Sequence, residues 1–402
     1  MNGERRPLDI AMVSEHASPL ARLGDVDAGG QNVAVARLSA AMAAHGHRVV
    51  VYTRRDDERL PDRVQAEEGY TVVHVPAGPP ARIPKDNLLH YMPEFGDFLC
   101  RSWGSERPEV AHAHFWMSGL AALRGARPHA VPVLQTFHAL GAVKRLHQGT
   151  RDTSPDERIR MEARLAHQAD WVLATCSDEV RELEAMGRRS RLSVVPCGVD
   201  VDKFRDVGPI AVRGKRKRIV SVGRLVPRKG FDTIIRAMPH IDATELVIVG
   251  GPDKAELDAD PEAIRLQRLA QRVGVADRVH LYGGIEPDEM PMLLRSADVV
   301  AATPWYEPFG IVPVEAMACG VPVIASAVGG MLDTVIDDVT GRLVPPKDPR
   351  AFAQAVQPLL WDRGLRNRLG NAGRARVCGP VHLGIMQPGH RRGLSAASGV
   401  SH

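Results

Sequence analysis

The sequence predicts an α/β protein built from two Rossmann-like domains, each a parallel sheet covered by helices. Three observations predict this class: a length of 402 residues, short β-branched runs that alternate with longer helical patterns, and one glycine-, proline- and arginine-containing break between two series of such runs. A chain of this length exceeds one ordinary hydrophobic core, so the length favours two or three domains. Alternating strands and helices are typical of parallel sheets buried on both faces.

The predicted strands fall into two series. The first comprises residues 9–14, 48–53, 71–75, 110–114, 131–136, 171–175 and 192–195, and the second comprises 218–222, 245–249, 279–282, 298–303, 321–325 and 341–344. Segment 204–217 separates the series and is the predicted linker, because it carries Gly208, Pro209 and Gly214. We therefore expect domains at 1–205 and 206–376. The tail, 377–402, is atypical and is expected to be disordered because it has no amphipathic period beyond its first residues.

Composition and charge exclude several classes of protein. Hydrophobic residues make up 44% and charged residues 25%, as in globular proteins, and the net charge of +4 implies no polyanionic partner for the whole chain. The five cysteines are widely spaced and lack a Cys-x-x-Cys pair, so neither a disulfide framework nor a zinc site is expected. No apolar run approaches the ~20 residues of a membrane span. We expect a cytoplasmic protein without a signal peptide or transmembrane helix.

The basic run at residues 213–218 has two interpretations. It could bind nucleic acid, or it could be a solvated hinge that precedes a strand. The hinge is favoured because no aromatic residues lie between the charges, so nucleic acid is not an expected partner.

Segment 304–326 is the most informative, because it places Glu307 and Glu315 eight positions apart across a strand-to-helix junction. The pattern predicts a strand at 299–303, its exit loop at 307–310 and a helix at 312–319. Two acidic acceptors beside the free N–H groups of a helix start suit a ligand that is rich in hydroxyls and carries a diphosphate. The alternative is an ordinary strand, loop and helix with two solvated glutamates.

Two cations follow the first predicted strand of the second series. Arg224 and Lys229 lie on a turn before a helix that is predicted to begin at Asp232. A guanidinium fork and an ammonium group suit a diphosphate whose leaving-group charge must be neutralised. The alternative, a pair of solvated cations, is disfavoured because the dipole of a helix start repels them.

A glycine pair lies in the first loop of the chain. Gly29 and Gly30 precede a predicted helix, so the backbone there could approach a phosphate closely, or the pair could be only a turn. Asp25 and Asp27 in the same loop could suggest a metal. No further ligands stand at suitable spacing, so no metal site is expected.

Histidines end two predicted strands of the first domain. His112 and His114 are interpreted as core residues. His138, near Gly141 and Lys144, is interpreted as functional, because a histidine at a strand end can hydrogen-bond substrate hydroxyls and titrates near neutrality.

These motifs together resemble the family 4 retaining glycosyltransferases of the GT-B fold. The resemblance covers residues 8 to about 376, and it rests on the following features in the family's order at compatible spacings: the Gly29-Gly30 loop, His138, Gly198, Arg224, Lys229 and the Glu307–Glu315 pair. It implies two facing Rossmann-like domains with an intervening cleft. The second domain would grip a nucleotide-sugar donor, and the first would supply most acceptor contacts.

The resemblance also implies roles for individual residues. Arg224 and Lys229 would hold the diphosphate, Glu315 the ribose hydroxyls and Glu307 the sugar. The implied donor site is Gly29, Gly30, Arg224, Lys229, Gly284, Glu307, Phe309, Gly310, Ile311 and Glu315, and the implied catalytic set is His138, Arg224, Lys229 and Glu307. The leaving phosphate itself would help to deprotonate the acceptor, so no enzyme nucleophile and no cofactor are expected. Mg²⁺ is compatible with this scheme but not indicated.

Within the family, segments 27–32, 77–85, 112–119 and 142–144 resemble the branch that transfers N-acetylglucosamine to inositol phosphate in mycothiol synthesis, and more loosely the sucrose-phosphate synthases. The acceptor contacts implied are Asn32, Lys85, Phe115, Ala139 and Lys144. Phe115 and Ala139 replace a tyrosine and a threonine that would touch the acceptor phosphate. Losing each hydroxyl donor would cost about 1–3 kcal/mol.

The expected function is transfer of a glucose- or N-acetylglucosamine-type sugar from a nucleotide sugar, UDP-linked, to a polar acceptor. Transfer to inositol phosphate is the alternative within the branch. Two rival functions lie in different classes: a sugar-nucleotide epimerase and a weakly active sugar-nucleotide-binding protein. The binding protein is considered because the family's return helix is expected to be missing or replaced after residue 377. A homodimer is compatible with the sequence.

Overall fold

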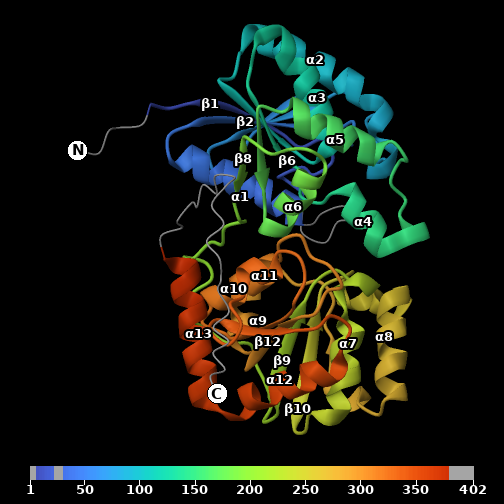
Figure 1. Ribbon diagram of the computed structural model, residues 1–402, viewed down its shortest axis with the longest axis vertical. Coiled ribbons are helices and arrows are strands. Elements are labelled where there is room, and N and C mark those ends of the chain that lie inside the picture. Colours follow the sequence, from blue (N-terminus) through green and yellow to red (C-terminus); the bar gives the residue numbers. More distant parts are fainter. Residues whose placement is uncertain (1–5, 22–29, 380–402) are drawn as a thin grey trace, which may run out of the picture.

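The computed structural model describes residues 6–21 and 30–379 and contains two sheets, one above the other in Figure 1. The first sheet has eight strands in the order β3-β4-β2-β1-β5-β6-β7-β8. Their bounds are β1 Asp9–Val13, β2 Arg48–Arg54, β3 Arg63–Gln65, β4 Thr71–Val75, β5 Val110–His114, β6 Val133–Thr136, β7 Trp171–Ala174 and β8 Leu192–Val194. All neighbours are parallel except β3, which pairs antiparallel with β4.

The second sheet has six strands, all parallel, in the order β11-β10-β9-β12-β13-β14. Their bounds are β9 Lys217–Val222, β10 Thr244–Val249, β11 Val279–Leu281, β12 Val299–Ala302, β13 Val323–Ser326 and β14 Gly341–Val344. The predicted class, two parallel-sheet α/β domains, is confirmed. The predicted boundary at residue 205 falls between the last strand of one sheet and the first strand of the other.

Helices cover both sheets (Figure 1). Those of the first half are α1 Gly30–Ala44, α2 Met92–Ser105, α3 Trp116–Ala126, α4 Gly141–Gln148, α5 Arg158–Gln168 and α6 Ser177–Ala185. Those of the second half are α7 Phe231–Ala237, α8 Pro261–Arg272, α9 Met290–Arg295, α10 Ile311–Ala318, α11 Met331–Thr334, α12 Pro349–Trp361 and α13 Arg363–Cys378. Asp260, Asp348 and Asp362 cap α8, α12 and α13, because each side chain accepts a hydrogen bond from a backbone N–H of the first turn.

Each sheet has its own hydrophobic core. Trp103, Trp116 and Phe95 are fully buried against the first sheet, and Phe231 and Phe352 are buried against the second. The two apolar cores hold the strands so that their carboxyl ends face one another across the middle of the molecule, where α1, α4 and α6 meet α10 and α11 (Figure 1).

The basic run at 213–218 is exposed in its middle, at Lys215 and Arg216, as the solvated-hinge interpretation predicts, but its two ends are anchored to the second half of the molecule. Arg213 donates to Asp298 at 2.6 Å, and Arg216 donates to Asp277 at 2.9 Å. Arg218 is buried and donates to Glu245 at 2.7 Å, because it already belongs to β9. Carboxylates of neighbouring elements pair with Arg213, Arg216 and Arg218, which the spacing of the run alone does not reveal.

The predicted tail lies mostly outside the described residues. Helix α13 ends at Cys378, and the part of the prediction that concerns residues 380–402 falls beyond it. Within the described ranges, no helix is long and apolar enough to cross a membrane.

Candidate active site

Glu307 is at the centre of a charged cluster at the carboxyl end of β12. Its side chain is 14% exposed, Lys229 Nζ donates to its Oε2, and Arg228 Nη1 lies 3.9 Å from the same oxygen. Burial by itself would raise the pKa of Glu307, but the charges of Lys229, Arg228 and Arg224 outweigh it and lower the pKa below its usual value. The carboxylate is therefore ionised and surrounded by cations.

A tight turn brings Lys229 to Glu307. Gly230 follows the short 3₁₀ helix Pro227–Lys229 with a φ of +70°, and a Cβ on it would lie 1.8 Å from the carbonyl oxygen of Thr303. The Thr303 hydroxyl donates to the Gly230 carbonyl at 2.9 Å. Because β9 and β12 are neighbours, this contact joins their exit loops and brings Lys229 and Glu307 together.

Glu315 lies one helical turn into α10 and faces the first half of the molecule. Arg37 Nη2, on α1, donates to Glu315 Oε1 at 3.1 Å. Burial raises the pKa of Glu315, and Arg37 opposes that rise only in part. The carboxylate predicted to bind ribose is thus engaged by an arginine that the sequence did not single out.

The start of α1 approaches the start of α10. A Cβ on Gly30 would lie 3.8 Å from Ile311 Cδ1. Gly310, which precedes α10, has a φ of +82°, and a Cβ there would meet Met331 Cε at 2.4 Å. The free N–H groups of both helix starts therefore lie on the boundary between the two sheets. Gly29, predicted beside Gly30, lies outside the described residues.

The remaining predicted donor residues lie at the same edge of the second sheet. Gly284 follows β11, and its N–H donates to the Pro252 carbonyl at 2.9 Å. Phe309 is 8% exposed, and its Cα lies close to Gly330 in the loop after β13.

Three histidines occupy the carboxyl ends of β5 and β6. His112 Nε2 lies 2.9 Å from Thr136 Oγ1, and His114 Nδ1 lies 2.9 Å from His138 Nε2. His138 has a φ of +61°, which turns the chain sharply after the strand. Burial lowers the pKa of His112 to about 4 and that of His138 to about 3, and it also lowers the pKa of His114. All three imidazoles are therefore neutral at neutral pH, and the expectation that His138 titrates there is wrong.

The predicted acceptor positions Phe115 and Ala139 both contact Arg158. The Arg158 guanidinium lies 5.0 Å from the centre of the Phe115 ring and donates to the Ala139 carbonyl at 2.6 Å. Arg158 also pairs with Glu162 at 2.7 Å, and both side chains are buried. Glu162 accepts a second hydrogen bond from the Gly141 N–H at 2.7 Å, so this pair fixes the loop that carries His138.

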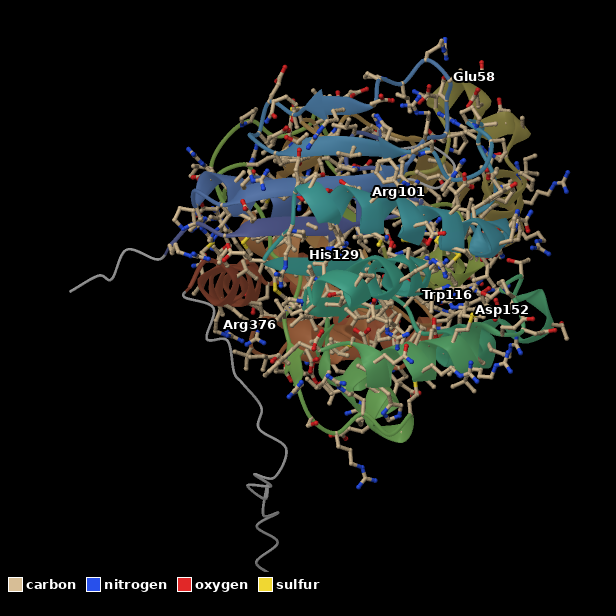
Figure 2. All side chains as sticks on the ribbon, turned by 90° about the horizontal axis from the view of Figure 1, so that it is seen from above. Glu58, Arg101, Trp116, His129, Asp152 and Arg376 are labelled. Carbon is tan, nitrogen blue, oxygen red and sulfur yellow. The ribbon has the colours of Figure 1, made fainter. Side chains whose placement is uncertain are left out.

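The other predicted acceptor contacts have varied surroundings. Lys144 donates to Ser154 at 2.8 Å and pairs with Asp152 at 2.9 Å, at the rim of the molecule where Asp152 lies in Figure 2. Asn32 is 6% exposed and donates to the Ser18 carbonyl at 3.0 Å. Lys85 begins a short 3₁₀ helix, Lys85–Asn87, beside Asp86, which itself lies 3.9 Å from Lys144.

A hydrogen-bond network next to Phe115 was not predicted from the sequence. Ser118 donates to the Glu15 carboxylate, and the Glu15 N–H donates back to Ser118 at 2.9 Å. His16 pairs with Glu15 at 2.8 Å and packs edge-on against Phe115 at 4.9 Å. A polar run, Ser14-Glu15-His16, directly after an apolar strand was the available signal.

Two further contacts join the halves outside the charged clusters. Asp333 on α11 accepts hydrogen bonds from the backbone N–H and the hydroxyl of Ser177, the first residue of α6. The Tyr306 ring stacks on His147 of α4 at 4.9 Å and packs against the core of the first sheet. Among residues 6–21 and 30–379, no group of three or more His, Cys, Asp and Glu side chains could hold a metal ion.

Family models match both halves of the chain. One described as Glycosyltransferase Family 4 matches residues 28–203, and one described as Glycosyl transferases group 1 matches residues 202–376. The first match covers α1 and the histidine loops, and the second covers Lys229, Glu307 and Glu315.

Curated relatives extend over nearly the whole chain. The D-inositol 3-phosphate glycosyltransferase of Xylanimonas cellulosilytica is 36% identical over 395 residues, covering 93% of each protein. The protein of the same name from Mycobacteroides abscessus is 34% identical over 374 residues, covering 89% of this chain and 83% of the relative.

Solved structures share the arrangement of two facing sheets. The sucrose-phosphate synthase of Thermosynechococcus elongatus superposes with a TM-score of 0.84 at 33% identity, covering 93% of this chain and 94% of that one. Anabaena HepE, solved with UDP-glucose, superposes with a TM-score of 0.70 at 19% identity, covering 92% and 94%, and so supports the fold alone. The chain therefore belongs to the family 4 glycosyltransferases of the GT-B fold, and it is a glycosyltransferase.

Proposed function

We propose that this glycosyltransferase takes a hexosyl group from a nucleotide-diphosphate sugar, UDP-linked, and transfers it with retention of anomeric configuration. The observation that carries the proposal is the cluster at Glu307, where Lys229 and Arg228 face one buried carboxylate at the start of α10. Two cations against one carboxylate leave positive charge for a diphosphate, and the helix start adds N–H donors. Glu307 then accepts hydrogen bonds from the sugar hydroxyls, and Glu315 from the ribose.

In the proposed reaction, the bond between the anomeric carbon and the donor phosphate oxygen breaks while the acceptor oxygen bonds to the same face of that carbon. The acceptor proton passes to the leaving phosphate oxygen. Lys229 and the neighbouring arginines stabilise the charge that develops on the diphosphate. Neutral His138, held by His114 at 2.9 Å, orients the sugar through hydrogen bonds. No step requires an enzyme nucleophile or a bound metal.

The acceptor in this proposal is a polyhydroxylated compound bound by the first half. Transfer to D-inositol 3-phosphate is the second candidate, favoured by the names of the curated relatives. The pairing of Lys144 with Asp152 and of Arg158 with Glu162 reduces the positive charge available for an acceptor phosphate, so inositol itself belongs in the same test.

Nucleotide release tests the proposal. UDP-N-acetylglucosamine and UDP-glucose would be incubated with inositol 3-phosphate, inositol, sugar phosphates and free sugars, and the product anomer determined by NMR. We expect acceptor-dependent release and a retained anomer. Turnover without acceptor would indicate an epimerase, donor binding without release a binding protein, and an inverted anomer would contradict the mechanism.

The roles of the two halves can be separated by substitution. Lys229→Ala should lower kcat by about 10²–10³-fold, because it removes a charge that acts on the leaving group. Lys85→Ala, in saturating acceptor, should retain most of the rate. Equal losses would contradict the assignment of donor chemistry to the second half.

A further inference from the structure

Arg37 and Glu315 form an ion pair between the two halves of the molecule. Their partner atoms are 3.1 Å apart although the residues are 278 positions apart in the chain. The Arg37 side chain is 33% exposed and that of Glu315 is 10% exposed, so both groups are partly shielded from water. The pair lies where the proposed function places the donor ribose.

Only half of the Arg37 guanidinium is used in this pair. Nη2 donates to Glu315, whereas Nη1 is buried and has no hydrogen-bond partner within the described part of the chain. The guanidinium lies 5.7 Å from the centre of the Phe204 ring, which limits its rotation. A buried hydrogen-bond donor without a partner is rare in native structures, so we expect a bound ligand to supply the acceptor.

The pair presents a donor and an acceptor side by side. Nη1 offers a hydrogen, and the carboxylate of Glu315 accepts one. A sugar hydroxyl both donates and accepts, so it complements such a pair, whereas a C–H group at the same place would leave both partners unmatched.

We propose that Arg37 is a donor-specificity residue, which together with Glu315 reads a ribose hydroxyl of the nucleotide. The inference rests on the proposed function, which puts the ribose at Glu315. Glu315 accepts the hydroxyl hydrogen, and Arg37 Nη1 donates to the hydroxyl oxygen. Because Arg37 belongs to the first half and Glu315 to the second, full ribose recognition requires the halves to be closed.

Calorimetric binding of UDP, 2′-deoxy-UDP and 3′-deoxy-UDP to the full chain tests the inference. The wild type should prefer UDP to at least one deoxynucleotide by about tenfold or more. Arg37→Gln should weaken UDP binding about tenfold and leave the binding of that deoxynucleotide unchanged, so that the preference disappears. Arg37→Lys keeps the charge without the fork and should lose the same preference, which keeps the test open if one variant folds poorly. Arg124→Gln, which breaks an arginine pair with Asp97 far from the boundary, is the matched control.

Two contrary outcomes can be distinguished with Glu315→Gln. If that variant weakens UDP binding but Arg37→Gln weakens all three nucleotides equally or none, the inference is overturned and the proposed function survives. If Glu315→Gln binds UDP as the wild type does, the ribose is not at Glu315, and both the placement and the inference fall.

Discussion

Glu307 and Glu315 have the same side chain but opposite electrostatic surroundings. Three cations act on Glu307 and lower its pKa, whereas Glu315 is buried beside one arginine and its pKa is raised. The first carboxylate therefore stays ionised under acidic conditions in which the second takes up a proton. A carboxylate that loses its charge also loses an acceptor oxygen.

Donor affinity should consequently fall on acidification because of Glu315. Its raised pKa means that it is protonated at a higher pH than an ordinary glutamate, while Arg37 and Lys203 act against protonation. We expect UDP binding to weaken as the pH falls from 7.5 towards 5 in the wild type. Calorimetry across this range checks it. Because the terminal phosphate of UDP also takes up a proton near about pH 6, Glu315→Gln should bind more weakly throughout and lose less affinity on acidification than the wild type. The same acid loss in Glu315→Gln would assign the effect to another group.

The functional residues that could be identified from the sequence are those at the carboxyl ends of strands that are neighbours in one sheet. Lys229 and Glu307, both singled out from the sequence, contact each other because their strands are neighbours. Arg37 and Arg158 were not identified from the sequence. The partner of Arg37 lies in the other half of the molecule, and the partners of Arg158 depend on how its helix packs against the loop that carries His138. Neither is visible in local spacing. His138 was placed correctly at a strand end, but its depth of burial, and hence its neutral state, was not predictable from the sequence.

At the element scale, strands were predictable where apolar runs were dense. The predicted ranges for β4, β5 and β14 agree with the observed bounds, and the helix predicted at 312–319 begins one residue earlier as α10. β3 was missed because Arg63-Val64-Gln65 has only one apolar residue and pairs at an edge. Edge strands need not alternate strongly, because one side of their ladder faces no neighbour.

The Gly230 turn between β9 and α7 should tolerate no side chain. Gly230→Ala would place a methyl group against the Thr303 carbonyl and would strain a φ of +70°. We expect a loss of about 1–3 kcal/mol in the free energy of unfolding, measured in urea. Gly214→Ala, with no atom within 4 Å of its added Cβ, is the control and should change stability little. Equal stability of the two variants would contradict the described turn.

At the scale of the whole molecule, helix α13 supports the contact between the halves. Arg376 on α13 donates to the Asp333 carbonyl at 2.7 Å, and the Asp333 side chain in turn binds Ser177 across the boundary. Figure 2 shows Arg376 on the side of the molecule away from Asp152. The halves are thus joined by the hydrogen bonds of Asp333 with Ser177 and by the stacking of Tyr306 on His147.

Asp333→Ala should loosen this closure. The variant loses the acceptor for two Ser177 donors, so small-angle scattering should give a larger radius of gyration, and the KM for the donor should rise. Asp277→Ala, which removes an exposed carboxylate within the second half, is the matched control. An unchanged scattering profile would show that the remaining contacts suffice.

The buried histidines make global stability depend on pH. Their pKa values in the folded state, about 4 for His112 and about 3 for His138, lie below the ordinary value of 6.5. At a pH between the folded-state value and 6.5, the folded protein therefore binds fewer protons than the unfolded protein. The stability that these two histidines contribute is therefore complete above pH 6.5 and falls on acidification, by at most about 1.4 kcal/mol per pH unit for each histidine. Urea unfolding from pH 7 to pH 5 checks this. His138→Asn, which tolerates a positive φ, should show a shallower decline, and an unchanged slope would contradict the burial of His138 as the cause.

The stacking of Tyr306 across the two halves has a consequence for the rate of turnover. Tyr306 immediately precedes Glu307, yet its ring packs into the core of the opposite half and lies on His147. Under the proposed function, opening of the halves to release the nucleotide product would expose this aromatic ring to water, which costs free energy. Turnover would then be limited by the rate at which the ring leaves its contact with the first half. Higher solvent viscosity slows this motion, whereas it leaves the rate of the chemical step unchanged.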